Sequence, residues 1–295
     1  MNYRDLVFIA VAENLSFSRA ASELFISQPA VTNHIKELET KYNTNLFERK
    51  GNKIYLTHNG KILYNSLKKI EQEYRNVEFE INKLNEEISG RFIIGASSTI
   101  SQYLIPKVIA AFHRKYPKLE IELINGNSFD MEKLLLENKI DLAMVENDLS
   151  QSGIQYRKFL NDELIVVTGA ESVYSKRKNI VKSDLLEIPI VLREKGSGTL
   201  EVIKNALARH NLDFEQLNTP IHLGSTESIK NFLLDFDGLA IVSAHAVQTE
   251  LRLKTLVEVK IADFNIPREF RLANRIGNRN NQVELFENFL FRYNY

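Results

Sequence analysis

The chain has 295 residues, which is enough for two or three compact units, and its balance of apolar and charged residues is that of an ordinary globular protein. It has no cysteine, which excludes a disulfide framework, a thiol nucleophile, a thiolate metal site and a cysteine redox switch. The formal net charge is zero, yet residues 1–70 hold ten Lys/Arg against six Asp/Glu, whereas residues 71–90 hold two against six. A basic N-terminal segment followed by an acidic segment is typical of a chain in which only the N-terminal module binds nucleic acid.

The first predicted element is an amphipathic helix over residues 2–13, with Leu6, Ile9 and Ala10 on its inner face. Acidic and amide residues interrupt this segment and no small-residue cleavage site follows, so it is not typical of a signal peptide. No stretch approaches the length of a membrane-spanning helix. We therefore expect a cytoplasmic protein without a membrane partner.

Residues 15–41 predict two short helices joined by a tight turn. Ser27 stands where a helix N-cap belongs, and Pro29 lies in the first turn, where its missing N–H does no harm. Apolar side chains recur at helical spacing on one face of each helix: Phe17, Ala20, Ala21 and Leu24 in the first, and Val31, Ile35 and Leu38 in the second. This arrangement is typical of a helix-turn-helix.

The second of these helices leaves a polar outer face. Amide, hydroxyl and ammonium groups in its first turns match the donors and acceptors of a DNA major groove, and the helix N-terminus attracts phosphate. An ordinary helical hairpin with a solvated face gives the same pattern, so both interpretations stay open. The residues predicted to meet DNA here are Ser27, Gln28, Pro29, Thr32, Asn33 and Lys36.

Residues 46–57 predict a hairpin, because an apolar start is followed by a basic Gly-Asn turn and then by Ile54 and Leu56 in alternation. A basic hairpin directly after a recognition helix forms a wing. We expect Arg49, Lys50 and Lys53 to reach flanking phosphates or the minor groove.

From Phe17 to Gly60 the sequence resembles the N-terminal domain of LysR-type transcriptional regulators. The motifs that carry the resemblance occur in the order that the family uses: Ser-Phe-Ser-Arg-Ala-Ala, Ser-Gln-Pro-Ala-Val, Ile-Lys-Glu-Leu-Glu, Leu-Phe-Glu-Arg and Leu-Thr-x-x-Gly. The resemblance extends more weakly over the whole chain. It implies a winged helix-turn-helix domain over residues 1–57 that binds double-stranded promoter or operator DNA, with RNA polymerase as a further partner.

Residues 58–88 predict one long helix with an unbroken heptad stripe: Leu63, Leu67, Ile70, Tyr74, Val77, Ile81, Leu84 and Ile88. Such a stripe needs a partner helix along its length. The alternative is a helix that lies on its own domain, but no neighbouring segment is long enough to cover it. We therefore predict a dimerising linker helix, and the family resemblance implies the same homodimer and its further assembly into a homotetramer.

After Gly90 strands and helices alternate, which predicts an α/β effector domain over residues 89–295. Two sheets are expected, with crossovers near 161–163 and 264–267, so subdomain I comprises 89–161 and 268–295 and subdomain II comprises 162–267. The resemblance implies the type-II periplasmic-binding-protein fold. Strands are predicted at 91–95, 119–124, 142–146, 156–160, 164–168, 188–192, 220–223, 238–243 and 268–275, and helices at 100–116, 131–138, 199–210, 226–235, 244–251 and 281–293.

Three stretches place hydroxyl groups at a helix start that follows a strand, where free N–H groups and the helix dipole attract anions. A purely capping role is the alternative, because Ser and Thr are common helix caps. We expect a small anionic effector between the two subdomains. The predicted contact residues are Ser97, Ser98, Thr99, Gly126, Asn127, Thr199, Ser225 and Thr226.

The stretches Ser-Gly-Thr and Leu-Gly-Ser-Thr-Glu-Ser-Ile-Lys resemble the branch of LysR-type regulators that controls carbon fixation and sulfur or nitrogen assimilation. Many members of that branch have Arg after Ser-Gly-Thr, whereas this chain has Leu200. Glu227 would repel an anion unless it faces away or meets a cation.

The competing function classes are a dehydratase-like enzyme and a solute-binding protein on the same scaffold. An enzyme needs a positioned carboxylate or histidine, and only Glu146 and Glu227 are candidates, both more simply read as surface or cap residues. The histidines show no metal-ligand spacing, and no phosphate loop or dinucleotide fingerprint is present. The sequence therefore predicts no catalytic residue, no metal and no cofactor.

Overall fold

The computed structural model describes residues 1–51, 53–84, 87–146, 150–177, 180–277 and 280–294. The chain forms two compact units, unit 1 over Met1–Glu87 and unit 2 over Ile88–Tyr295. Within the described residues, no helix combines the length and the apolar character that crossing a membrane requires.

Unit 1 begins with three helices, α1 (Tyr3–Asn14), α2 (Phe17–Glu23) and α3 (Gln28–Tyr42). Each helix starts at a polar side chain that accepts a hydrogen bond from a backbone N–H of the first turn: Asn2, Ser16 and Ser27 respectively. The predicted cap at Ser27 is confirmed, with Oγ accepting from the Ala30 N–H at 3.3 Å. These caps explain why the helices begin where the sequence pattern places them.

The core of unit 1 lies between these three helices. Val31, Ile35 and Leu38 of α3 are buried with Ala20 and Ala21 of α2, as the spacing predicts. The prediction for α1 was wrong at Leu6, which is 39% exposed. The buried residues of α1 instead include the continuous run from residue 7 to residue 12, so α1 is covered on several sides and its sequence lacks a single apolar stripe.

A two-stranded antiparallel hairpin follows, β1 (Phe47–Lys50) and β2 (Lys53–Leu56). The helix after it is capped by Thr57, whose Oγ1 accepts from the Gly60 N–H at 3.0 Å. A Cβ added at Gly60 would lie 2.1 Å from the Leu46 carbonyl oxygen. The glycine of the Leu-Thr-x-x-Gly motif is therefore required by the close approach of the long helix to the hairpin.

The long helix α4 extends over His58–Leu84, and residues 85–86 of its predicted continuation lie outside the described residues. The predicted end at residue 88 is wrong, because residues 87–88 are not helical and Ile88 packs against a core of unit 2 instead of continuing the stripe. The heptad stripe divides into two parts. Leu63 and Leu67 pack into the core of unit 1 and so need no second chain. From Ile70 onward the stripe faces solvent, and its residues are 44% to 85% exposed: Ile70, Tyr74, Val77, Ile81 and Leu84. The part of the predicted stripe that could pair with a second chain is therefore its second half, from Ile70 to Leu84.

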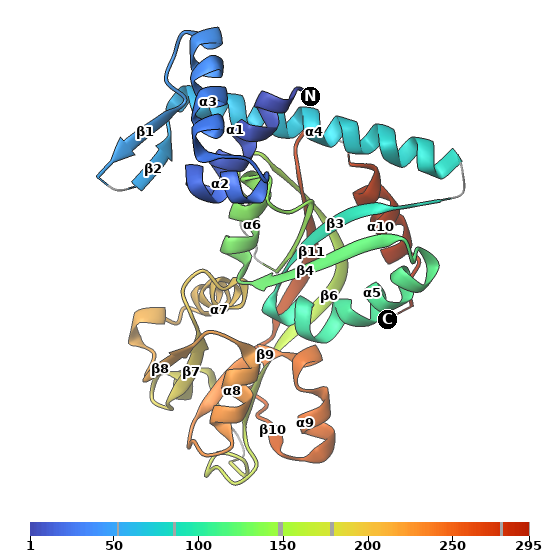
Figure 1. Ribbon diagram of the computed structural model, residues 1–295. Helices are drawn as coiled ribbons and strands as arrows, with labels where there is room; N and C mark the ends of the chain where they lie inside the picture. The colour runs from blue at the N-terminus through green and yellow to red at the C-terminus, as the bar shows by residue number, and fades with distance from the viewer. Residues whose placement is uncertain (52, 85–86, 147–149, 178–179, 278–279, 295) are drawn as a thin grey trace. The chain divides into compact units, whose positions relative to one another are not determined.

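Unit 2 contains one continuous nine-stranded sheet with the order β4-β3-β5-β11-β6-β9-β7-β8, and β10 also pairs with β6 (Figure 1). Parallel pairs lie toward both ends of the order, and the pairs made by β6 and β11 are antiparallel. The strands are β3 (Gly90–Ser97), β4 (Leu119–Gly126), β5 (Leu142–Val145), β6 (Ile154–Gly169), β7 (Ile190–Arg193), β8 (Ile221–Leu223), β9 (Leu239–Ser243), β10 (Leu256–Glu258) and β11 (Ile266–Arg275).

The predicted separation into two sheets is wrong, because β6 and β11 belong to both halves of unit 2. Residues 161–163, expected to be a crossover, lie inside the 16-residue strand β6 and pair with residues 267–269 of β11. The polar interruption in β6 misled the prediction. Asp162 is buried there, and its position in the strand is explained by its ion pair with Arg268 of β11.

The helices of unit 2 follow the predicted alternation: α5 (Ile105–Lys115), α6 (Ser128–Leu136), α7 (Gly198–Arg209), α8 (Thr226–Leu233), α9 (Gln248–Leu253) and α10 (Asn281–Leu290). Two predicted helices are divided. The 100–116 segment starts as a π-helical turn, η1 (Ile100–Leu104), because Pro106 lacks the N–H that an α-helix needs near this junction. The 244–251 segment splits into the short 3₁₀ turn η4 (Ala244–Ala246) and α9. Two further 3₁₀ turns, η2 (Lys182–Leu186) and η3 (Phe214–Gln216), were not predicted.

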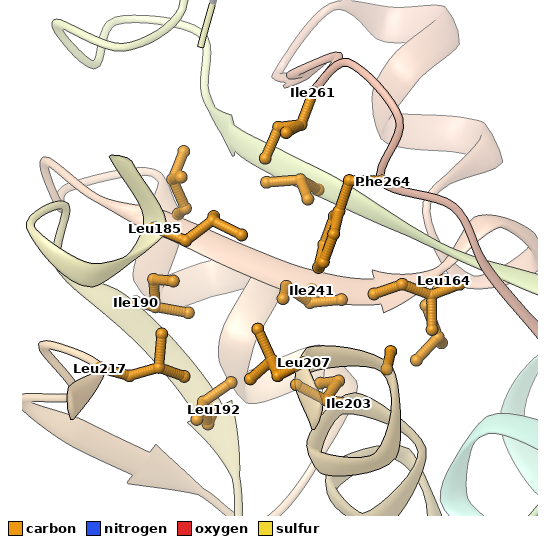
Figure 2. Close-up of a cluster of buried hydrophobic side chains, with 14 of the residues drawn as sticks. Leu164, Leu185, Ile190, Leu192, Ile203, Leu207, Leu217, Ile241, Ile261 and Phe264 are labelled. Carbon is orange, nitrogen blue, oxygen red and sulfur yellow. The ribbon is translucent and has the colours of Figure 1, made fainter. Parts of the chain in front are cut away.

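Two large apolar cores hold the sheet and its helices together. Figure 2 shows the first, where Ile203 and Leu207 of α7 converge with Ile190, Leu192 and Ile241 of the sheet. The second lies between β3, β5 and β11 and the helices α5 and α10, with the rings of Phe112 and Phe286 at 5.1 Å between centroids. Each half of unit 2 therefore has its own core, and β6 and β11 connect them.

Candidate functional site

The outer face of α3 brings together the residues predicted to meet DNA. Gln28, Pro29, Asn33 and Lys36 are exposed, Thr32 is half-buried, and these five residues line one shallow depression of the surface. Ser27 is exposed at the N-cap immediately before them. Because the opposite side of α3 is buried in the core, packing fixes the orientation of the helix and so the direction in which this face points.

The wing offers cations on the β1–β2 hairpin. Arg49, Lys50 and Lys53 are all exposed, and Arg49 lies opposite Ile54 in the antiparallel register. Lys50 Nζ pairs with the Glu48 carboxylate at 2.9 Å, with both side chains largely in solvent. An exposed pair of this kind is weak and exchanges readily for a phosphate. The hairpin is therefore suited to non-specific backbone contact.

In unit 2 the predicted hydroxyl groups are mostly buried rather than open to solvent. Ser97, Ser98 and Thr99 at the end of β3, Thr199 at the start of α7 and Thr226 at the start of α8 are each at most 3% exposed. Burying a hydroxyl group costs free energy unless it forms a hydrogen bond. These buried hydroxyls therefore need hydrogen-bond partners.

Two of the predicted effector residues act as helix caps, as the alternative interpretation holds. Ser225 Oγ accepts from the Ser228 N–H at 3.1 Å, and Asn127 Oδ1 accepts from the Asp130 N–H at 2.9 Å. Gly126 lies against Met131, where an added Cβ would come within 2.6 Å of the methionine methyl group. Asn127 nevertheless lies beside Gly196, so it stands next to the loop that leads to Thr199.

A buried ionic network joins the two halves of unit 2 around Arg268. Its Nε donates to Asp162 Oδ2 at 2.5 Å, and its Nη1 donates to Thr199 Oγ1 at 2.9 Å. Thr199 in turn donates to the Glu146 carboxylate at 3.2 Å, and Ser97 donates to the other oxygen of the same carboxylate. Residues of β3, β6, β11 and α7, and the end of β5, therefore meet at one point.

Several buried donors at this junction have no hydrogen-bond partner within the part of the chain that the structure describes. They are the hydroxyls of Ser98, Thr99, Ser128 and Ser197 and the Nη2 of Arg268. The segments that carry them are linked, since the Phe129 N–H donates to the Gly196 carbonyl at 3.3 Å. An unsatisfied buried polar group costs about 1–3 kcal/mol, so these five donors on connected segments form the candidate site for a hydrogen-bonding ligand.

The start of α8 is joined to η1 by a second polar cluster. Tyr103 Oη donates to the Glu227 carboxylate at 2.6 Å, and Lys230 Nζ pairs with the same carboxylate at 2.7 Å. Burial and the bond to Glu227 raise the pKa of Tyr103, so its hydroxyl stays a donor. Burial alone would raise the pKa of Glu227, but the bonds from Lys230 and Tyr103 lower it. Glu227 thus meets a cation, which removes its repulsion of an anion.

Arg193 provides a further buried cation beside the predicted residue Thr226. Its guanidinium donates to both oxygens of the Glu194 carboxylate at 2.8 and 2.9 Å, and its Nη1 lies 3.5 Å from Thr226 Oγ1. The positive charge next to the α8 N-terminus is therefore largely matched by Glu194.

Comparison with known families decides between the function classes. Residues 6–61 match the family model "Bacterial regulatory helix-turn-helix protein, lysR family", and residues 85–293 match the model "LysR substrate binding domain". The chain belongs to the LysR family of transcriptional regulators. The dehydratase-like enzyme is thereby rejected as an alternative, because the matching families and relatives are regulators.

Individual relatives agree with this LysR assignment over nearly the whole chain. The regulator is 33% identical to a probable RuBisCO transcriptional regulator of Trieres chinensis, over 96% of this chain and 93% of that protein. It is 29% identical to the HTH-type transcriptional regulator CysL of Bacillus subtilis, over 89% and 87%. The Synechocystis PCC6803 CcmR regulatory domain, solved in complex with 2-PG, matches 69% of this chain and 96% of its own, with 27% identity and a TM-score of 0.62.

Sequence reasoning about this LysR regulator missed the charged centre of the site. Arg268, Asp162 and Arg193 were not predicted, and Glu146 was wrongly placed at the surface, although it is 1% exposed. No signal separated Asp162 and Arg268 from their neighbours, since β6 and β11 each carry several other charged residues. A buried charge of this kind requires a partner, but the sequence does not show which one.

Proposed function

We propose that this regulator binds a palindromic operator as a homodimer, with α3 in the major groove and the hairpin on flanking phosphates, and that a small anion in unit 2 modulates the binding. The single observation that carries the DNA-binding part is the division of α3 into a fully buried apolar face and one exposed polar depression. Because the regulator must reach chromosomal DNA, we also propose a cytoplasmic location.

In the proposed complex Gln28, Thr32, Asn33 and Lys36 face base edges, and Ser27 and Pro29 bring the helix N-terminus to a phosphate. Arg49, Lys50 and Lys53 hold the backbone or enter the minor groove beside it. The exposed half of the α4 stripe pairs two copies so that two half-sites are read together. Further pairing through unit 2 gives a homotetramer, and RNA polymerase is the partner that a bound activator or repressor meets.

Replacing Gln28 by Ala is expected to relax the sequence preference of the regulator at one base pair, because a base-edge contact is lost. Lys53→Ala should instead weaken binding to every duplex about equally and reduce the slope of log K against log[salt] by about one. Binding titrations on selected and scrambled duplexes at several salt concentrations separate the two effects. A uniform loss of affinity for Gln28→Ala would contradict its base-reading role.

The effector part of the proposal rests on the unpartnered donors around Arg268. Hydroxyl groups and a guanidinium nitrogen are donors, so together they suit an anion that bears several acceptor oxygens, such as a phosphate or carboxylate. Leu200, which stands where many branch members have Arg, lies in the apolar core of unit 2. We propose that Arg268 supplies the cation in this chain. The relative that was solved with 2-PG supports an anionic metabolite of this chemistry.

The anion would act by binding one arrangement of the two halves more tightly than another. The contact of Tyr103 with Glu227, together with the links through Arg268, spans both halves and would be favoured or loosened by the ligand. The resulting population shift is limited by the ligand's differential affinity for the two arrangements. It would reach the DNA as a change in the angle between paired unit 1 domains.

Thr99→Ala and Thr226→Ala are each expected to abolish the response to the effector while leaving operator affinity without effector nearly intact. The effector is first identified by a thermal-shift screen of phosphorylated and carboxylated metabolites that includes 2-PG. Thr255→Ala is the matched control, because Thr255 is exposed and its hydroxyl only approaches the Glu250 carbonyl at 3.5 Å. An unchanged thermal shift in both test variants would remove the proposed effector site.

A further inference from the structure

We infer that contacts within unit 1 fix the hydrogen-bonding polarity of the two amides on α3 before DNA is bound: Ser18 makes Gln28 a donor, and Glu37 makes Asn33 an acceptor. This inference rests on the proposed placement of α3 in the major groove. It adds two positioning residues, Ser18 and Glu37, and it predicts which base edges the regulator selects.

Ser18 holds the carbonyl end of the Gln28 side chain. The Ser18 hydroxyl on α2 donates to Gln28 Oε1 at 2.9 Å, across ten residues of sequence. Both helices are anchored in the same core, α2 by Ala20 and Ala21 and α3 by Val31. The distance between Ser18 and the Gln28 backbone is therefore set by packing. With Oε1 directed at Ser18, the amide group Nε2 points away from α2 as a double donor.

A glutamine fixed in this way cannot read every base equally. Recognition of adenine uses both amide atoms of Asn or Gln, one accepting from N6–H and one donating to N7. A Gln28 whose Oε1 is held by Ser18 offers mainly its N–H groups, which match the two acceptors O6 and N7 of guanine and O4 of thymine, whereas adenine offers the acceptor N7 only beside its N6–H donor. The base edge opposite Gln28 should therefore be guanine or thymine rather than adenine.

Asn33 is held with the opposite polarity. Its Nδ2 donates to Glu37 Oε1 at 2.9 Å, one helical turn further along α3. Glu37 also forms an exposed ion pair with Arg4 of α1, whose Nε lies 2.5 Å from Glu37 Oε2. With one of the two N–H groups of Asn33 engaged by Glu37, the side chain offers mainly Oδ1, which accepts from N4–H of cytosine or N6–H of adenine.

The two amides address different base pairs. Five residues separate Gln28 and Asn33, which is about 7.5 Å along a helix axis. Thr32 is consistent with this order of donors and acceptors. Its hydroxyl donates to the Gln28 carbonyl at 3.0 Å, so its oxygen is left as an acceptor. The face of α3 thus offers donors at Gln28 and acceptors at Thr32 and Asn33. This order specifies which base edges are favoured at two positions of a half-site.

Selection of duplexes from a random pool by the full-length regulator, followed by sequencing, tests the inference without a known operator. The wild-type protein should enrich guanine or thymine at one position of the half-site, and Gln28→Ala should erase that preference. Ser18→Ala should keep the position but lower the preference over adenine about three- to tenfold, the size expected from one lost hydrogen bond. Glu37→Ala should act likewise at a second position, where cytosine or adenine is preferred.

Ser22→Ala is the matched control, since its hydroxyl donates only to the Ser18 carbonyl within α2, and it should leave all preferences unchanged. Circular dichroism melting shows that each variant folds. Adenine enriched at the Gln28 position, or a Ser18→Ala profile identical to wild type while Gln28→Ala still erases the position, would overturn the inference and leave the proposed function standing. No changed position for Gln28→Ala would overturn both.

Discussion

Replacing Arg268 by Met is expected to lower the free energy of unfolding of unit 2 by about 3–5 kcal/mol, because it leaves Asp162 and Glu146 as buried carboxylates without their cation. The side chains of Arg268 and Asp162 are both 0% exposed, so water cannot replace the lost charge. The loss is far larger than the change in apolar volume between Arg and Met explains. The loss of stability should be largest in β6 and β11, which carry Asp162 and Arg268.

Hydrogen exchange measured by mass spectrometry on the full-length protein locates this effect. Peptides of β6 and β11 should exchange at least about a hundredfold faster, since each 1.4 kcal/mol corresponds to a factor of ten. Peptides of α3 serve as an internal reference because they lie in the other unit.

Lys158→Met is the matched control, because Lys158 of β6 also pairs with an acid on β11, Glu269, at 2.6 Å. Those two side chains are 45% and 48% exposed, so the expected loss is under about 1 kcal/mol. Equal losses in the two variants would show that burial of the Arg268 network contributes no special stability.

The sequence predicted unit 1 well because its signals are local. The cap at Ser27, the proline after it and the stripe of Val31, Ile35 and Leu38 all lie within one helix, and each acts through neighbours a few residues away. The exposed polar face follows from the same periodicity. What periodicity did not show is that Leu6 faces solvent, since α1 is covered by several elements at once.

Unit 2 was predicted as strands and helices but not as a sheet, because strand pairing is not local. The alternation of apolar and helical segments placed most strands within two or three residues, yet nothing in the pattern showed that β6 and β11 pair along their length. Asp162 and Arg268 lie 106 residues apart in the chain. Their contact depends on that pairing, so the charged centre of the proposed effector site could not be derived from the hydroxyl motifs alone.

The hydroxyl motifs were nevertheless informative in a limited way. These motifs lie where a strand ends and a helix begins. Such strand ends lie together where the order of strands in a sheet reverses. Ser97 and Thr199 therefore both reach the Glu146 carboxylate. The same motifs also serve ordinary capping, as Ser225 shows. A cap and a ligand contact require the same residue types, so only the buried and unpartnered hydroxyls separate the two roles.

Replacing Val77 by Glu is expected to dissociate the proposed homodimer and to lower operator affinity at least about a hundredfold, because a single unit 1 then binds one half-site without its tethered partner. Val77 is 57% exposed in the middle of the apolar stripe formed by Ile70, Tyr74, Ile81 and Leu84. Two copies paired along this stripe bring the new carboxylates together in an apolar seam, where each charge loses its hydration. The helix itself should persist, since glutamate has a higher helix propensity than valine.

Sedimentation equilibrium and operator titration together test this interface. Asn65→Glu adds the same charge to an exposed position on the opposite side of α4, and it should leave both the mass and the operator affinity unchanged. A Val77→Glu protein that keeps the wild-type mass would show that another surface pairs the chains. A monomer that keeps wild-type operator affinity would instead contradict the two-half-site mechanism, because one α3 and one wing would then suffice for specific binding.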